Sequence, residues 1–89
     1  MNKSQLVERV AQRLSTSKLQ AARLVDSVLD EIQEGLRDDG TVTITGFGTF
    51  EVKERKARVG RNPSTGAPMP IEAGRRVGFR VGKGLRESV

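Results

Sequence analysis

The side chains of this chain offer little catalytic chemistry. There is no His and no Cys, so the commonest general base and the most reactive nucleophile are both missing. Without Cys, neither a disulfide nor a thiolate metal site can form. The segment Gly46-Phe47-Gly48 is not a phosphate loop, because no helix start and no Gly-Lys-Ser/Thr sequence follows it. We therefore expect a protein that is not an enzyme and that carries no metal site and no cofactor.

Binding of a polyanion is the chemistry that the charged residues favour. The net charge is +5, and the ten cations beyond residue 40 face only four acidic residues, whereas residues 1–40 carry a charge of −1. Such asymmetry is expected of a chain that binds nucleic acid or an acidic membrane surface. No apolar run approaches the roughly 20 residues that span a bilayer, and the start lacks the apolar stretch of a signal peptide. We therefore expect a cytoplasmic protein.

The densest cationic segment, residues 53–61, has no apolar face that could pack on a core. Its charges are mostly arginines at a spacing of three, with lysines between them: Lys53, Arg55, Lys56, Arg58 and Arg61. A few charges on an exposed strand edge discourage sheet aggregation, but that explanation accounts poorly for a whole arm of them in so short a chain. We therefore interpret the segment as a surface for phosphates and for a DNA groove.

Residues 60–66 predict a turn, since two glycines flank an Asn-Pro step. Pro63 lies at its centre, and residues 53–74 are therefore predicted to form a long two-stranded arm whose tip is near this proline. A rigid apolar side chain at the end of a ribbon can wedge between base pairs, unstack them and bend the duplex. Position alone does not separate this role from that of a proline that only shapes the turn.

The rest of the chain must position this arm, and its periodicity predicts an α+β fold. Apolar residues at helical spacing predict helices over residues 3–14 and from residue 17 to about residue 38. Beyond Gly40 the apolar period changes to two, which predicts strands over 41–45, from 49 onward and over 77–81, before a short helix over 83–87. Pro68 and Pro70 are expected to face the unpaired outer edge of the arm, since neither can donate to a ladder.

The apolar stripe of the second helix is too wide for one neighbour to cover. The first helix covers part of it, and the remainder needs a sheet, a second subunit or both; the stripe includes Val28, Leu29, Ile32 and Leu36. The only aromatic residues are three phenylalanines, which is little bulk for the core of so short a chain. Either a partner subunit supplies the missing burial, and folding then depends on chain concentration, or the chain is a weakly stable monomer.

Two motifs at this separation resemble the signature of the bacterial histone-like HU/IHF family, and HU in particular. They are Gly46-Phe47-Gly48-Thr49-Phe50 and Gly60-Arg61-Asn62-Pro63-Ser64-Thr65-Gly66. The start, Met1 to Leu6, and the end, Gly82 to Leu85, are similar as well, so the resemblance covers the whole chain. It implies an intertwined dimer of chains that each have two N-terminal helices, a three-stranded antiparallel sheet, a long β-ribbon arm and a short C-terminal helix. Two such arms would reach around double-stranded DNA.

The resemblance also implies roles for individual residues. Pro63 would be the intercalating wedge, and the groove would be lined by Lys53, Arg55, Arg58, Arg61 and Asn62. Lys3 and Lys83 would contact phosphates on the body. The shared dimer core would contain Phe47, Phe50 and Phe79, together with Val28, Leu29, Ile32, Leu36 and Ile44. Charge and position add candidates for contact with flanking DNA, namely Arg75, Arg76, Arg80 and Arg86.

This chain departs from the family in two places. Many members have Val-Pro-Ala before the Phe of the last strand, where this chain has Arg76-Val77-Gly78, and their arm returns through Lys-rich residues, where it has Ala67-Pro68-Met69-Pro70. Compared with those members, this chain therefore has fewer cations on the returning strand and more at the root of the arm. We expect one domain with three parts: helices for dimerisation (1–40), a sheet with the C-terminal helix (41–52 and 75–89) and a DNA-binding arm (53–74).

The leading hypothesis is a histone-like, nucleoid-associated homodimer that bends and compacts double-stranded DNA from the minor groove with little sequence preference. A heterodimer with a paralogue and an IHF-like site-specific bender are the alternatives within the same class. An RNA-binding protein fits less well, because single-strand binders favour stacking aromatics and the arm has none. A module for an acidic protein partner leaves Pro63 and the arm without a purpose. Neither a membrane nor a small-molecule substrate is expected as a partner.

Overall fold

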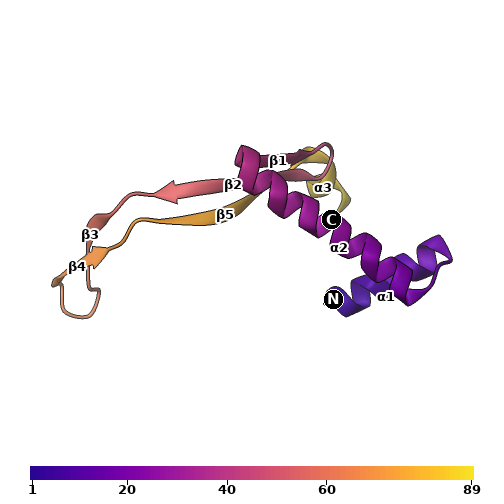
Figure 1. The fold of residues 1–89 in the computed structure, drawn as a ribbon. Coiled ribbons are helices and arrows are strands. Elements are labelled where there is room, and N and C mark those ends of the chain that lie inside the picture. The colour runs from indigo at the N-terminus through magenta and orange to yellow at the C-terminus, as the bar shows by residue number, and fades with distance from the viewer.

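The computed structural model describes all 89 residues, and it joins a helical part to a sheet that extends into a long arm (Figure 1). Its elements, in chain order, are α1 (Lys3–Leu14), α2 (Lys18–Asp39), β1 (Thr41–Ile44), β2 (Gly48–Arg55), β3 (Arg58–Arg61), β4 (Pro68–Ile71), β5 (Gly74–Val81) and α3 (Lys83–Ser88). The predicted α+β plan is confirmed. Most element ends differ from the predicted ones by about one residue, as at Thr45, which belongs to the turn after β1. The exception is β5, which begins at Gly74, three residues before the strand predicted over 77–81. None of the helices is both long and apolar enough to cross a membrane.

The two long helices begin and end at the residues that their capping chemistry favours. Asn2 forms a capping box with Gln5 at the start of α1. Ser17 Oγ accepts a hydrogen bond from a backbone amide in the first turn of α2, and Gly40 ends that helix with a positive φ of 79°. The helices pack on each other through a small buried cluster of Val7, Ala21 and Val25. This cluster is the only multi-residue core that the single chain encloses.

Three strands form the antiparallel sheet of the body, in the order β1-β2-β5. The register sets Val42 opposite Phe50, and Phe50 opposite Phe79. Because side chains alternate between the faces of a strand, these three residues share one face, which we call the helix face. A methyl group added at Gly35 of α2 would lie 2.7 Å from Val42 Cγ2. The apolar side of the sheet therefore packs against α2.

The opposite side of the same sheet is polar, and we call it the saddle face. Its residues occupy alternate positions on the three strands: Thr41, Thr43, Thr49, Glu51, Lys53, Arg55, Gly74, Arg76, Gly78 and Arg80. A 3.3 Å hydrogen bond between Thr43 Oγ1 and Thr49 Oγ1 places these two side chains on the same side of β1 and β2. Most residues of the saddle face are exposed, so this face can meet a large partner.

The arm consists of two paired pieces in series. β2 and β5 remain paired out to Arg55 and Gly74, and a second ladder of β3 and β4 continues toward the tip (Figure 1). The ladders belong to separate sheets, and residues 56–57 and 72–73 lie between them outside any strand. The predicted two-stranded arm is therefore present, but its hydrogen-bond ladder is interrupted near the root.

The two prolines of β4 occupy positions where the ladder needs no donor. At the end of the β3–β4 ladder, the Asn62 amide donates to the Ala67 carbonyl at 2.8 Å. Bonded and non-bonded pairs alternate along an antiparallel ladder, so Pro68, one step further on, belongs to a non-bonded pair, and so does Pro70. Their nitrogens face the outer edge of the ribbon, as predicted.

The single chain is far from compact. Its Cα radius of gyration is 18.7 Å and its longest extent is 58 Å, whereas a compact chain of this length has a radius of gyration of about 12 Å. Only five residues are buried, and among them Leu36 is the one that lies near the sheet from the far end of α2. The arm and the open helix face account for this extended shape.

Candidate nucleic-acid interface

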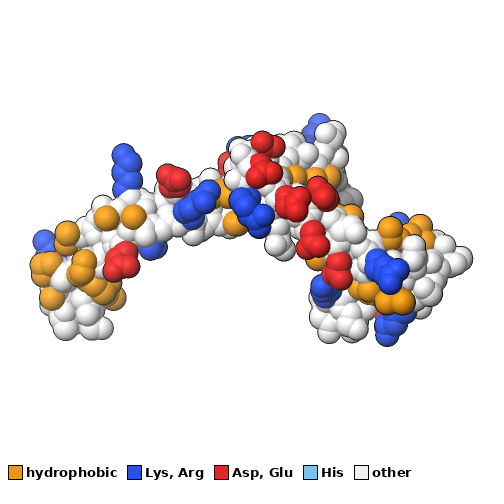
Figure 2. Space-filling model, viewed as in Figure 1, with side chains coloured by type: hydrophobic (Ala, Val, Ile, Leu, Met, Phe, Trp, Pro, Cys, Tyr) orange, Lys and Arg blue, Asp and Glu red, His pale blue; other side chains and the backbone are white.

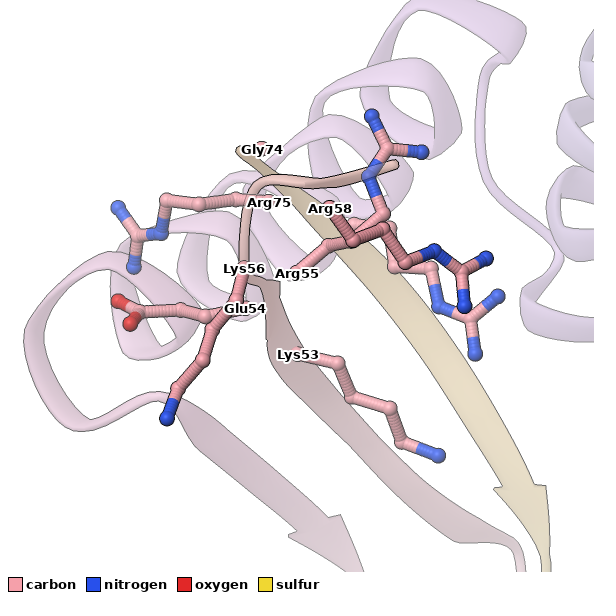
Figure 3. A pocket seen from close by; sticks show the side chains of 8 residues that line it. Lys53, Glu54, Arg55, Lys56, Arg58, Gly74 and Arg75 are labelled. Atoms are coloured by element: carbon pink, nitrogen blue, oxygen red, sulfur yellow. The ribbon is translucent and has the colours of Figure 1, made fainter. Parts of the chain in front are cut away.

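Cations of β2, β5 and the start of β3 surround an open hollow of about 550 Å³ at the root of the arm (Figure 3). No apolar residue lines it; the lining consists of Lys53, Glu54, Arg55, Lys56, Arg58, Gly74, Arg75 and Arg76. Six of these eight residues are cations and one is an anion, so the hollow concentrates positive potential. Its chemistry suits a phosphate backbone rather than an apolar ligand.

The strand register divides these cations between the two faces of the sheet. Lys53 lies opposite Arg76 on the saddle face, whereas Glu54 lies opposite Arg75 on the helix face. Figure 3 shows the same division, with Glu54 and Arg75 extending to one side of the ribbon and Lys53 and Arg55 to the other. The sequence predicts one role for Arg75 and Arg76, but only Arg76 shares a face with the other predicted contacts of β2.

Arg55 is held in place at the point where the first ladder ends. Its Nε donates to the backbone carbonyl of Glu72 across the ribbon at 3.1 Å. The opposite residue is Gly74, where an added methyl group would lie 3.5 Å from the Arg55 guanidinium. The guanidinium is therefore directed across the gap between the two ladders, and Arg58 continues the row of cations on the other side of the gap.

The tip presents Pro63 on a hydrogen-bonded turn. The Ser64 amide donates to Asn62 Oδ1 at 2.8 Å, and Arg61 Nη1 donates to the Gly66 carbonyl at 3.2 Å. Asn62 is half-buried and its side-chain oxygen serves the turn, while Pro63 is exposed. Hydrogen bonds among the residues on either side of Pro63 thus fix the turn that carries the proline.

Lys3 on the body is already engaged by an acidic residue. Its Nζ lies 2.6 Å from Asp26 Oδ1 of α2. This hydrogen bond, and then the charge of Asp26, raise the pKa of Lys3 above its usual 10.5. A phosphate at Lys3 would therefore compete with Asp26 for the ammonium group. The other predicted cations of the body are exposed on β5 and α3: Arg80, Lys83 and Arg86.

The three phenylalanines form one cluster beside the sheet. The ring centroids of Phe50 and Phe79 are 4.8 Å apart, and those of Phe47 and Phe79 are 5.6 Å apart. Even so, Phe47 is 44% and Phe79 is 43% exposed. The single chain therefore assembles the predicted aromatic cluster without covering it.

The aliphatic residues predicted for a dimer core are also largely uncovered. Val28, Leu29 and Ile44 are exposed and Ile32 is half-buried, whereas Leu36 alone is buried within its own chain. The helix face adds Val77, which is 59% exposed. These residues form an apolar surface along α2 and the sheet that the single chain leaves exposed to solvent.

Sequence reasoning missed one feature of the saddle face. Gly74 and Gly78 alternate with Arg76 and Arg80 on the same side of β5. The sequence shows that these residues are two apart. The face of the sheet that they occupy depends on the register of β5 with β2, and periodicity does not predict a register. Lys56 was recognised as part of the cationic segment, and the structure adds it to the lining of the hollow.

A cationic sheet face that continues into an arginine-lined β-ribbon defines a nucleic-acid-binding protein of the β-ribbon class. Comparison with known proteins gives the family. The sequence model for the family described as "Bacterial DNA-binding protein" matches residues 1–89, and the chain belongs to this family. The resemblance to HU/IHF proteins that its motifs indicated is confirmed.

Curated relatives match the whole chain. The DNA-binding protein HU-beta of Salmonella typhimurium is 46% identical, and the DNA-binding protein HU of Geobacillus stearothermophilus is 47% identical; both alignments cover all of this chain and 99% of the relative. Among solved structures, an Anabaena HU–DNA cocrystal structure has a TM-score of 0.83 at 45% identity, covering 99% of this chain and 96% of that one. A mutant HU from Thermotoga maritima has a TM-score of 0.70 at 28% identity, with coverage of 99% and 97%.

Proposed function

We propose that this chain is a histone-like architectural protein that binds double-stranded DNA as a dimer, enters the minor groove with its arms, and bends and compacts the duplex. The observation that carries the proposal is a path of cations from the saddle face along the arm to the exposed proline. On the saddle face that path comprises Arg80, Arg76, Lys53 and Arg55. Arg58 and Arg61 of β3 continue it toward the tip, one on each face of the outer ribbon. The structural similarity to an Anabaena HU that was crystallised with DNA supports the same partner for this chain.

Low sequence specificity follows from the chemistry of the arm. Its polar contacts are mainly guanidinium and ammonium groups, which bind phosphates without reading the bases. The minor groove distinguishes little more than A·T from G·C pairs. Asn62 is the one amide side chain at the tip, and its oxygen already accepts a hydrogen bond from the Ser64 amide within the turn. The arm therefore has few groups with which to select a sequence.

Bending follows from the wedge and the charges acting together. Unstacking one base step costs a few kcal/mol, and the kinked duplex then contacts more of the basic surface. Pro63 supplies the rigid wedge at the end of the arm, and the saddle face supplies the basic surface. We assign phosphate contacts on the body to Lys3, Lys83 and Arg86 as well, with Lys3 exchanging Asp26 for the DNA.

Dimerisation follows from the uncovered apolar residues. Val28 and Val77 are each 59% exposed, and Phe79 is 43% exposed. Burying such side chains stabilises an interface by roughly 25 cal/mol per Å². A second copy of the chain provides a matching apolar surface by two-fold symmetry, so a homodimer is the simplest assembly; a paralogue with the same surface would give a heterodimer. The helical part, residues 1–40, would supply most of this interface, and the function implies residence on the nucleoid.

The wedge is tested with a duplex that carries a donor and an acceptor dye at its ends. Pro63→Ala should bind with an affinity near that of the unmodified protein but should bend the duplex less, seen as a lower transfer efficiency at saturation. Pro70→Ala is the matched control, since it changes the same residue type in the arm away from the tip. Equal bending by Pro63→Ala and the unmodified protein would remove the wedge from the proposal.

Salt dependence and competition test the rest of the function. With roughly 6–10 phosphate contacts, log K should fall with log salt with a slope of about −5 to −9. Random-sequence DNA should compete as well as any chosen duplex. A preferred sequence that resists such competition would point instead to an IHF-like site-specific bender.

A further inference from the structure

Two cations of the saddle face lie directly opposite each other without a strong acidic partner. The register pairs Lys53 of β2 with Arg76 of β5, and like charges in such a cross-strand pair are destabilising. Arg76 forms no ion pair in the structure, and Lys53 Nζ has only a long contact of 4.0 Å with Glu51. The pair therefore lacks an anion at the place where the arm joins the body.

The strand beside this pair leaves room for a ligand to approach its backbone. Gly74 and Gly78 flank Arg76 on the saddle face. A methyl group at Gly78 would meet only Lys53 Cε, at 3.9 Å, which is an ordinary van der Waals distance. Neither glycine has a positive φ, so the backbone does not require glycine at these positions. Gly78 therefore leaves open space on one side of Arg76, whereas the Arg55 guanidinium lies beside Gly74 on the other side.

We propose that Lys53 and Arg76, with the clearance at Gly78, form a seat for one phosphodiester group of the duplex on the body side of the arm. This inference rests on the proposed DNA binding and deepens it, because it assigns one defined phosphate contact to a pair of residues at the root of the arm. A phosphate between the two cations relieves their repulsion and accepts charge-assisted hydrogen bonds from both. The missing side chain at Gly78 lets the sugar-phosphate backbone approach the strand. The seat lengthens the DNA contact along the saddle face toward Arg80.

A pair of neighbouring arginines makes the test selective. Arg76→Ala and Arg75→Ala remove the same charge, but Arg76 is on the saddle face and Arg75 is on the helix face opposite Glu54. Affinity for a fluorescent duplex is measured by anisotropy at several salt concentrations. Arg76→Ala should reduce the magnitude of the salt slope by about one for each chain and weaken binding several-fold, whereas Arg75→Ala should leave the slope nearly unchanged. Arg76→Lys should restore the slope.

Gly78→Val tests the clearance without changing any charge. Valine favours a strand, so the melting temperature of the free protein should not fall, while DNA affinity and the salt slope should both decrease. Equal slopes for Arg75→Ala and Arg76→Ala, or full affinity in Gly78→Val, would overturn the seat. Bending is measured in parallel: if the unmodified protein binds without bending, the proposed architectural function fails, whereas the contrast between Arg75 and Arg76 still decides the seat.

Discussion

The contribution of Lys3 to DNA binding depends on the ion pair that it already forms with Asp26. Lys3 is protonated at neutral pH, and its hydrogen bond with Asp26 raises its pKa further. Because the folded-state pKa is raised, the stability that this ion pair contributes is fully present below the unfolded value near 10.5 and is lost as the pH rises through the folded value. At physiological pH the exchange of Asp26 for a phosphate is therefore a competition between two anions, with no proton transfer.

Removing that competitor should strengthen DNA binding. Asp26→Asn keeps the shape of the side chain but frees Lys3, so we expect several-fold tighter binding at low salt and a steeper salt slope. Glu34→Gln on the same helix is the control, because it removes an equal charge with no ion pair in the structure. Titrations of both variants at matched ionic strength decide the point, and equal gains in the two would show that only net charge matters.

Among the elements, the join between β2 and β5 depends on a missing side chain. A methyl group at Gly48 would collide with the ring of Phe79 and would lie 2.7 Å from the Arg80 carbonyl oxygen. The Arg80 carbonyl belongs to the backbone of the sheet, so it cannot give way as the end of a flexible side chain can. Gly48 therefore permits the close approach of strand and aromatic ring at the base of the sheet.

Gly48→Ala should consequently destabilise the protein by about 1–3 kcal/mol, the usual cost of overpacking. Gly78→Ala is the matched control in the same sheet, since its added methyl group meets nothing closer than 3.9 Å. Urea unfolding of the two variants gives the comparison. A Gly48→Ala protein as stable as Gly78→Ala would mean that the Phe79 cluster yields readily.

Elements with a strong local signal could be predicted from the sequence, and relations between strands could not. The ranges of both long helices and the turn around Pro63 follow from local chemistry, and the structure confirms them. The opposite faces of Arg75 and Arg76 depend on the register of β5 against β2, which is set by packing between distant segments. The interruption of the arm had no counterpart in the apolar pattern, since residues 56–57 carry no periodic signal.

At the scale of the whole molecule, the chain exposes more surface than a self-contained protein of its mass. Its accessible surface is 7413 Å², whereas a compact monomer of 9.7 kDa exposes about 5,100 Å². Part of the excess belongs to the arm, and part to apolar residues along α2 and the helix face. Figure 2 shows the elongated outline, with acidic residues over the helical part and apolar side chains gathered near the tip of the arm.

If a second subunit covers those residues, stability must depend on concentration. Tenfold dilution weakens a dimer by about 1.4 kcal/mol of apparent stability, which should lower the melting temperature by roughly 3–5 °C for a folding unit of two chains. Calorimetry at several protein concentrations measures this directly. A melting temperature independent of concentration would indicate the weakly stable monomer.

A pair of exposed valines locates the interface. Val28 on α2 is 59% exposed and Val59 on the arm is 74% exposed. Val28→Asp should dissociate the dimer at micromolar concentration in sedimentation velocity, whereas Val59→Asp should leave its mass unchanged. The reverse result would place the contact between subunits on the arms.

The gap between the two ladders of the arm gives the molecule a hinge. Because residues 56–57 and 72–73 lie outside any strand, the outer ladder can turn against the inner one without breaking a bond of either ladder. The one hydrogen bond at stake is that from Arg55 Nε to the Glu72 carbonyl. An arm with such a joint can follow DNA of different width and curvature. We therefore expect the arms to bind nicked, gapped and intact duplexes with the outer ladder at different angles to the inner one. The change of backbone conformation would be confined to residues 56–57 and 72–73 of each chain.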